Sequence, residues 1–287
     1  MKFFSLLYAS IFLILLAGCE NKMTTDQKTT HDSKISDESC YQQLGLEEFQ
    51  NSNASPHIFI IIDQTTPFNK PLEKHLEDQL KPLFRAGNIF TLAEISTFSK
   101  DYHTRITANA HIDTPLTFDQ EQDVPRNKIK KFKNCIQKQA DTVTSILPQE
   151  IKKTLSNSNN TIDQSDLLKS FQDLADSTIK KSSSEKKVII IASDMLEHSS
   201  ITSFYGRNIN PSQELRKIKR AGLLTDFQGA KVYVLGAGTI SENDSKTTKR
   251  TIQTMQNLKK FWNLYFTASN ATLVEFGAPE LLNPIER

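Results

Sequence analysis

The segment IFIIID, residues 58–63, joins five apolar side chains to a terminal carboxylate. A continuous apolar run of this length is typical of a strand that is buried on both faces, as in a parallel sheet. A second run of the same kind, KVIIIAS at residues 187–193, is also followed directly by an aspartate, Asp194. The two segments predict strands of one mainly parallel sheet, and each carries a carboxylate at its end.

Three further strands are predicted at residues 88–98, 231–235 and 272–276. Between the strands, apolar residues recur every three or four positions, which is the spacing of one helix face. These helical stripes cover residues 72–83, 167–179 and 252–266. The alternation predicts a doubly wound, mostly parallel α/β sheet of Rossmann-like type with helices on both faces.

Residues 99–160 interrupt this alternation. A polar stretch over 100–123 precedes a helix whose apolar positions run from Ile129 to Leu147, and Pro148 is expected to stop or kink that helix. We interpret the region as a helical insertion carried on the sheet.

The N-terminus predicts export. After Met1 and Lys2, residues 3–16 form an apolar run of 14 residues, about 21 Å long as a helix. That length falls short of the ~30 Å bilayer core, so residues 1–18 are expected to be a signal peptide.

The next four residues, Leu16-Ala17-Gly18-Cys19, resemble the bacterial lipobox at every position. The resemblance implies cleavage before Cys19, a diacylglycerol on its thiol and an acyl chain on its amine. Several acyl chains give stable anchoring. The following residue is Glu20, which under the sorting rule of enteric bacteria implies the outer membrane, facing the periplasm in a Gram-negative host.

Residues 19–39 are expected to be a flexible tether. Positions 20–39 hold no Phe, Trp or Tyr and only two large apolar residues, Met23 and Ile35, too few to offset the entropy of ordering. The rest of the chain, residues 40–287, is expected to form one domain.

The chain has three cysteines. With Cys19 lipidated, Cys40 and Cys135 remain, and an oxidising compartment favours a disulfide between them. Two free, buried thiols are the alternative. A net charge of +2, from 35 basic and 33 acidic residues, gives no electrostatic reason to expect a nucleic-acid partner.

The strand ends suggest a cation site. Ligands of open α/β sheets bind beyond the carboxyl ends of the strands, where this chain places Asp63, Thr65 and Asp194. Carboxylates with hydroxyls beside them are hard oxygen ligands suited to Mg²⁺ or Mn²⁺. The alternative is that these side chains only cap helices and turns.

Over roughly residues 55–280 the chain resembles the von Willebrand factor A-like, or integrin inserted-domain, family. That family has a first strand ending in Asp-x-Ser-x-Ser, a later loop hydroxyl before a helix, and a strand ending in [Ser/Thr]-Asp. The matching positions are Asp63, Thr65, the pair Ser193-Asp194, and either Ser165 or Thr161 as the loop hydroxyl. The second serine position is Pro67, which has no side-chain oxygen, so the metal site is incomplete.

The resemblance implies a protein-binding module in which a carboxylate from the partner completes the shell of the metal. We therefore expect a non-enzymatic, membrane-anchored lipoprotein that binds a protein of the cell envelope. One alternative is a metal-dependent phosphohydrolase, but Thr65 replaces the second aspartate of its Asp-x-Asp motif. Another is a periplasmic solute-binding lipoprotein, for which no second α/β half is found.

Other motifs point to structure. Gly236-Ala237-Gly238 lacks the third glycine of a dinucleotide loop. His198 is expected to be a solvated loop residue, with a place near the rim of the site as the alternative, and His103 and His111 lack helical metal-ligand spacing. The basic run at 126–133 is expected to be a solvated helix face, with anionic lipid as its alternative partner.

Overall fold

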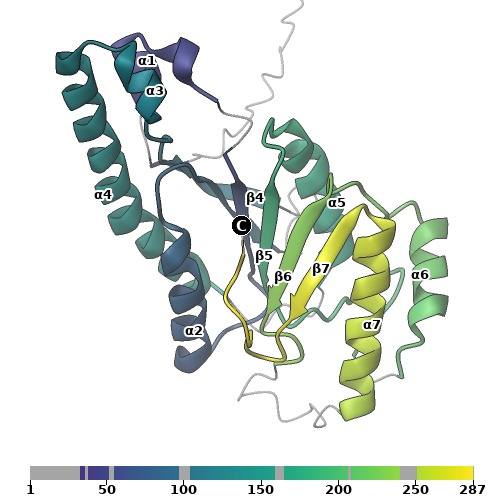
Figure 1. Cartoon of the computed structure of the whole chain (residues 1–287). Helices are drawn as coiled ribbons and strands as arrows, with labels where there is room; N and C mark the ends of the chain where they lie inside the picture. The colour runs from purple at the N-terminus through teal and green to yellow at the C-terminus, as the bar shows by residue number, and fades with distance from the viewer. Residues whose placement is uncertain are drawn as a thin grey trace, which may run out of the picture.

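The computed structural model describes residues 33–35, 38–51, 55–96, 104–158, 165–205, 208–239 and 251–286. In these residues one seven-stranded sheet carries helices on both faces (Figure 1). The strands are β1 Ser33–Lys34, β2 His57–Asp63, β3 Ile89–Ile95, β4 Thr104–His111, β5 Lys187–Ala192, β6 Ala230–Leu235 and β7 Ala271–Phe276. The α-helices are α1 Cys40–Leu44, α2 Lys70–Leu80, α3 Phe118–Gln122, α4 Arg126–Ser156, α5 Leu167–Ser177, α6 Pro211–Arg220 and α7 Ile252–Ala268. Short 3₁₀ turns follow α1, α2 and α5, at Glu47–Phe49, Lys81–Leu83 and Ile179–Lys181.

The mostly parallel α/β sheet predicted from the sequence is confirmed. The strand order is β1-β4-β3-β2-β5-β6-β7, and all pairs are parallel except β3 with β4. Counted from β2 to β7 along the chain, this is the order 3-2-1-4-5-6 of doubly wound folds. The order reverses between β2 and β5, which makes their junction the switch point of the sheet.

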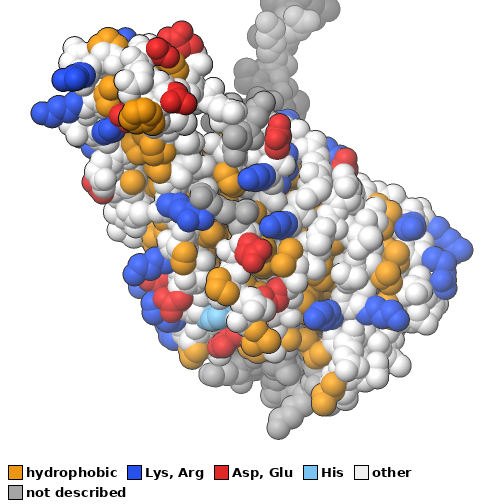
Figure 2. Space-filling model, viewed as in Figure 1, with side chains coloured by type: hydrophobic (Ala, Val, Ile, Leu, Met, Phe, Trp, Pro, Cys, Tyr) orange, Lys and Arg blue, Asp and Glu red, His pale blue; other side chains and the backbone are white. Residues whose placement is uncertain are grey.

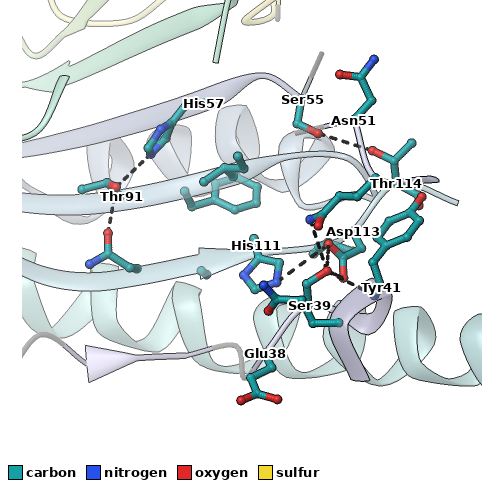
Figure 3. A pocket seen from close by; sticks show the side chains of 17 residues that line it. Glu38, Ser39, Tyr41, Asn51, Ser55, His57, Thr91, His111, Asp113 and Thr114 are labelled. Carbon is teal, nitrogen blue, oxygen red and sulfur yellow. Dashed lines mark hydrogen bonds and ion pairs between the residues drawn. The ribbon is translucent and has the colours of Figure 1, made fainter. Parts of the chain in front are cut away.

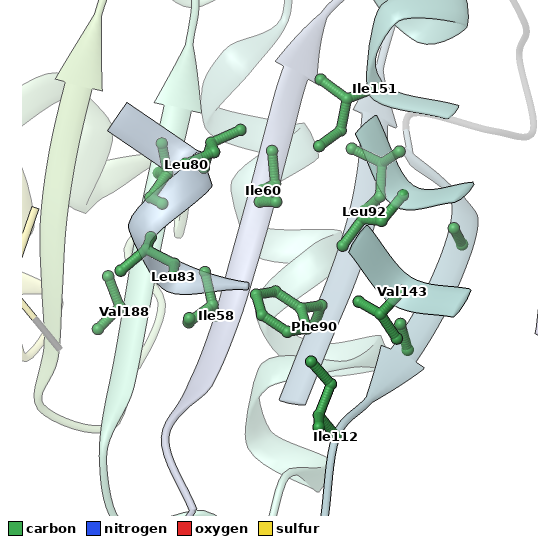
Figure 4. Packing of buried hydrophobic residues seen from close by; sticks show 14 of the residues in the cluster. Ile58, Ile60, Leu80, Leu83, Phe90, Leu92, Ile112, Val143, Ile151 and Val188 are labelled. Atoms are coloured by element: carbon green, nitrogen blue, oxygen red, sulfur yellow. The ribbon is translucent and has the colours of Figure 1, made fainter. Parts of the chain in front are cut away.

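The apolar run of β2 is buried on both faces, as predicted. Ile58, Ile60 and Ile62 pack under α2 and α4, whereas Phe59 and Ile61 pack toward α5 and α7. Side chains alternate along a strand, so every residue of the run serves one of the two cores. Figure 4 shows the first of these cores, with Ile58, Ile60, Leu80, Leu83, Phe90, Leu92, Ile112, Val143, Ile151 and Val188 in contact across the sheet and its helices.

The predicted insertion at 99–160 contains the expected helix but also a strand that was not predicted. The polar stretch contains β4, which pairs antiparallel with β3, and its sequence TRITANAH escapes the apolar pattern because only Ala108 and Ala110 are buried in it. The insertion therefore extends the sheet before it forms a helix. We also missed α6, in which Ile218 is the buried residue.

Pro148 does not end α4. The helix runs 31 residues to Ser156 with the proline inside it. A proline removes one backbone hydrogen bond and crowds the preceding turn, but Leu147 and Ile151 on either side are buried in the core. Their packing keeps the helix continuous past the proline.

The predicted tether is too long at its C-terminal end. Ser33 and Lys34 pair with β4, and the Ile35 N–H donates to the Asn109 carbonyl at 2.9 Å. Ser39 caps α1. The predicted signal peptide, Cys19 and the first part of the predicted tether lie outside the described residues. None of the helices in the described part of the chain is long and apolar enough to cross a membrane.

A disulfide joins α1 to α4. Cys40 and Cys135 are bonded, with their Cα atoms 5.9 Å apart and a sequence separation of 95. Of the two alternatives left open by the sequence, the structure contains the bond. It attaches the N-terminal segment to the long helix.

Loss of this bond should destabilise the fold. A cross-link that closes a 95-residue loop restricts the unfolded chain by about 4–5 kcal/mol. Cys135→Ser removes the cross-link and is expected to lower the free energy of unfolding by up to that amount in urea titrations. Cys135 is only partly buried, so the serine itself should add little further cost. Reduction of the wild type should reproduce the loss, and reduction of the variant should add nothing. Equal stability of oxidised and reduced wild type would contradict this expectation.

Candidate functional site

Asp63 and Asp194 lie at the switch point of the sheet. β2 and β5 pair in parallel with Ile62 opposite Ala192, so the residues that follow the two strands emerge side by side. This is the edge at which open α/β sheets bind ligands.

Asp63 is the centre of a hydrogen-bond network. It is 1% exposed, and both of its carboxylate oxygens accept hydrogen bonds. Thr65 donates to Oδ1 from its backbone N–H at 2.8 Å and from its hydroxyl at 2.6 Å. Oδ2 accepts from the hydroxyls of Ser193 at 2.6 Å and Thr66 at 3.3 Å. Three hydroxyl groups from two strand ends thus point their protons at one carboxylate.

Burial raises the pKa of Asp63 above its ordinary value, and the hydrogen bonds from Ser193 and Thr65 oppose that rise. A buried carboxylate costs free energy unless hydrogen bonds or a positive charge compensate it. Within the described residues no lysine or arginine forms an ion pair with Asp63. A cation beside Asp63 would supply the positive charge that these hydrogen bonds do not.

Ser165 and Asp194 complete the set predicted from the sequence. The Thr65 and Ser165 hydroxyl oxygens are 3.3 Å apart, and Ser165, which is 3% exposed, lies two positions before α5. The backbone N–H of Asp194 donates to the Thr66 hydroxyl at 3.3 Å. Asp63, Thr65, Ser165 and Asp194 thus belong to one network, whereas Thr161, the other candidate for the loop hydroxyl, lies outside the described residues.

Ser193 and Thr66 also donate hydrogen bonds to Asp63, although neither was predicted to be a ligand. Ser193 belongs to the [Ser/Thr]-Asp pair, so the motif itself contained the signal. Thr66 stands one position before Pro67 and supplies a hydroxyl to Asp63 that the proline lacks. Thr66 is one residue out of register with the family pattern, so the motif assigned it no ligand role.

The turn after Asp194 is strained. Met195 has φ = 61°, a left-handed conformation that costs a residue with a side chain about 1 kcal/mol. Its N–H donates to the Ser193 hydroxyl and its carbonyl accepts from Trp262 Nε1, both at 2.9 Å. The turn aims Asp194, whose Oδ1 accepts from the Leu196 N–H at 2.9 Å.

Neighbouring elements hold the loop after Asp63. The Gln64 side chain donates to the Thr154 carbonyl near the end of α4 at 3.1 Å. Phe68 packs on Gly236, where a Cβ atom would lie 2.5 Å from the ring and φ is +95°. Gly236-Ala237-Gly238 is therefore the turn after β6, and its first glycine makes room for the site loop.

The β5–α6 loop forms the rim of the site. Ser165 and His198 exchange backbone hydrogen bonds of 3.1 and 2.7 Å. His198 is half-buried with Nδ1 2.8 Å from the Ser203 hydroxyl, so the prediction of a solvated loop histidine is wrong. Next to it, Glu197 is 0% exposed and accepts from the Leu168 N–H at 3.1 Å. Burial raises the pKa of Glu197 to about 8.

A pocket opens at the opposite edge of the sheet from Asp63 and Asp194 (Figure 3). It measures about 360 Å³, and its buried polar groups bond to one another. Asp113 accepts from Ser39 Oγ, from the Cys40 N–H and from Gln139 Nε2. The ring nitrogens of His57 contact the hydroxyls of Ser182 and Thr91, and burial with nearby Lys187 lowers its pKa to about 4. These groups attach α1 and β2 to the fold.

The basic run at the start of α4 lies on an exposed helix face, with Lys130, Lys131 and Lys133 exposed and Lys133 paired to Glu121 at 2.7 Å. Figure 2 shows basic and acidic side chains interspersed on this side of the molecule. A mixed surface offers no continuous field for an anionic partner.

The donor set at Asp63 suits a hard cation through hydroxyl oxygens. Within the described residues no group of three or more His, Cys, Asp or Glu side chains is placed to hold a metal. The hydroxyls of Thr65 and Ser193 each direct their proton to Asp63. A hydroxyl oxygen that donates its proton retains lone pairs, and oxygen ligands are those that Mg²⁺ and Mn²⁺ prefer.

No protein-family profile and no curated protein matches the chain. Among solved structures, the pilus adhesin SpaC from Lactobacillus rhamnosus GG, in its open conformation, aligns with a TM-score of 0.37 and 11% identity over 79% of this chain. The alignment spans 28% of the adhesin chain. A similarity of this size supports no conclusion about fold or function.

Glu197 should make stability depend on pH. The folded chain holds the Glu197 proton up to about pH 8, whereas the unfolded chain releases it near the ordinary value of 4.5. Stability is therefore expected to fall as the pH rises from 4.5 to 8. Glu197→Gln should remove part of that slope and stabilise the fold at pH 8, relative to pH 5, by more than about 1 kcal/mol in urea titrations. Glu185→Gln, at an exposed glutamate, should leave the slope unchanged. An unaltered slope in Glu197→Gln would show that burial does not raise the pKa of Glu197.

Proposed function

We propose that this chain is an exported, lipid-anchored protein whose domain, of von Willebrand A-like type, binds a protein partner in the cell envelope without catalysing a reaction. The observation that carries the proposal is the convergence of Asp63, Thr65, Ser165 and Asp194 at the switch point. These residues are separated by up to 131 positions in sequence, yet hydrogen bonds connect them around the Asp63 carboxylate, with Asp194 joined through its backbone N–H to the Thr66 hydroxyl. The strained turn at Met195 supports a functional role, since such strain is concentrated at binding sites.

The four residues would hold Mg²⁺ or Mn²⁺. Asp63 accepts hydrogen bonds from the hydroxyls of Thr65, Thr66 and Ser193, which leaves lone pairs on the hydroxyl oxygens for the ion. A bound divalent ion would provide a positive centre that a carboxylate of the partner can bind. The chain itself orients the oxygens, buries the negative charge and excludes water from Asp63.

The burial of Asp63 favours binding over nucleophilic catalysis. An aspartyl nucleophile must present an oxygen to its substrate, whereas Asp63 is 1% exposed with hydrogen bonds on both oxygens. Thr65, at the position of the general acid in the phosphohydrolase alternative, donates its proton to Asp63 itself. These contacts support the proposal of a recognition site.

The lipid anchor rests on the Leu16-Ala17-Gly18-Cys19 motif. Acylation of Cys19 would hold the domain at the membrane surface. An outer-membrane position facing the periplasm follows from Glu20 if the host has two membranes.

Divalent ions should stabilise the purified chain. At 100 times its dissociation constant a ligand adds about 2.7 kcal/mol, so Mn²⁺ is expected to raise the melting temperature by about 5 °C or more over the value in EDTA. Asp63→Asn and Asp194→Asn should abolish the increase, because they remove ligand charge. Asp113→Asn, at the buried aspartate of the opposite edge, should retain it. A wild type that melts identically in EDTA, Mg²⁺ and Mn²⁺ would refute the cation site, and turnover of a generic phosphomonoester lost in Asp63→Asn would refute the non-enzymatic assignment.

Cys19 should decide membrane attachment. In cells that express the full chain, the wild type is expected in the membrane fraction, extractable by detergent and not by high salt. Cys19→Ser removes the thiol that carries the lipid, so this variant should not be lipidated. Cys135→Ser, which keeps Cys19, should remain lipidated. If the mature wild type has the mass of a chain that has lost its signal peptide and carries no lipid, the anchor is contradicted.

A further inference from the structure

A small hairpin connects two parts of the candidate site. After Asp194 the chain folds back on itself, with the Phe204 N–H donating to the Glu197 carbonyl at 2.8 Å and the Ser199 N–H to the Thr202 carbonyl at 2.9 Å. One side of this hairpin is bound to Ser165 through His198. The hairpin, residues 197–204, therefore starts beside one predicted ligand and is attached to another.

The residue that leaves the hairpin returns to the site. The Tyr205 hydroxyl lies 3.4 Å from Oδ2 of Asp194, and the Tyr205 ring packs edge-on against His198 with centroids 5.6 Å apart. The Tyr205 N–H also contacts the Ser203 hydroxyl at 3.4 Å, and Ser203 in turn bonds His198. Three contacts thus set the position of the phenol above Asp194.

Asp194 is consequently held at both oxygens. Oδ1 accepts from the backbone N–H of Leu196 at 2.9 Å, and Oδ2 has the phenol of Tyr205 as its neighbour. Each carboxylate oxygen has two lone pairs, so an oxygen that accepts a hydrogen bond can still face a cation. A carboxylate fixed at two points loses little freedom when an ion binds, which is the way outer groups raise metal affinity.

Tyr205 stands at the entrance of the site. It is 40% exposed, whereas Asp194 beneath it is 7% exposed. Pro67 withholds the oxygen that the family pattern places in the loop after β2, so the site has one group fewer on that side. The phenol adds a polar group on the opposite side, from the β5–α6 loop.

We propose that Tyr205 is a positioning residue of the cation site: its hydroxyl orients the Asp194 carboxylate for a divalent ion. This inference rests on the proposed function, because it requires that an ion binds there. It adds a residue outside the motif that identified the site. Tyr205 acts through Asp194, and its ring remains at the surface.

The experiment measures Mn²⁺ affinity of the purified full chain in detergent, from the electron paramagnetic resonance signal of free Mn²⁺. Tyr205→Phe removes only the hydroxyl and is expected to raise the Mn²⁺ dissociation constant about 10-fold, the lower end of the range for groups that orient a metal ligand. Its melting temperature in EDTA should stay within about 1 °C of the wild type, because a long and partly exposed hydrogen bond adds little stability. A merely structural role would lower the melting temperature and leave Mn²⁺ affinity unchanged.

Tyr41→Phe is the matched control. The Tyr41 hydroxyl donates to the Thr114 carbonyl at 2.7 Å, at the opposite edge of the sheet, so its loss should leave Mn²⁺ affinity at the wild-type value. Wild-type affinity in Tyr205→Phe would overturn the inference and leave the proposed function standing. No Mn²⁺ binding by the wild type would overturn both.

Discussion

The site depends on the burial of one carboxylate. Asp63 ends a strand that is enclosed by two hydrophobic cores, so its charge has no access to bulk water. Hydroxyls from the segments after β2 and β5 compensate it, and they can do so only while the two strands stay in parallel register with Ile62 opposite Ala192. The same register that builds the core therefore assembles the site, and a shift of one residue would turn every side chain to the other face.

The remaining elements support that junction from both sides of the sheet. On one face α4 reaches the site loop through Gln64 and Thr154, and its other half carries the disulfide to Cys40. On the other face α7 fixes the strained turn through the bond from Trp262 to Met195. Since a left-handed residue persists only where its surroundings over-determine it, this packing is what allows Asp194 to face the site.

The two ends of the sheet have different roles. At the edge near α1, the polar groups of Asp113 and His57 are satisfied by neighbours from the fold. At the carboxyl edge, the hydroxyls donate inward to Asp63 and the rim carries an exposed tyrosine. Both carboxylates are buried and hydrogen-bonded, but Asp113 accepts from a backbone N–H, an amide and one hydroxyl, whereas Asp63 is surrounded by three hydroxyls whose oxygens keep lone pairs.

The sequence by itself determined the parallel strands, the two strand-end aspartates and the helices at 72–83, 167–179 and 252–266, because burial on both faces and on one helix stripe leaves an apolar period that can be read directly. It did not reveal β4, whose polar residues belong to a strand with one exposed face, nor the continuation of α4 through Pro148, which depends on packing at Leu147 and Ile151. Ser33 and Lys34 lack any apolar signal, because they join the sheet through backbone hydrogen bonds. The roles of Thr66, Met195 and Tyr205 were decided only by the tertiary structure. Their hydrogen bonds to Asp194, to Trp262 and to the Asp194 carboxylate join positions 128, 67 and 11 residues apart, and such bonds leave no periodic pattern in the chain.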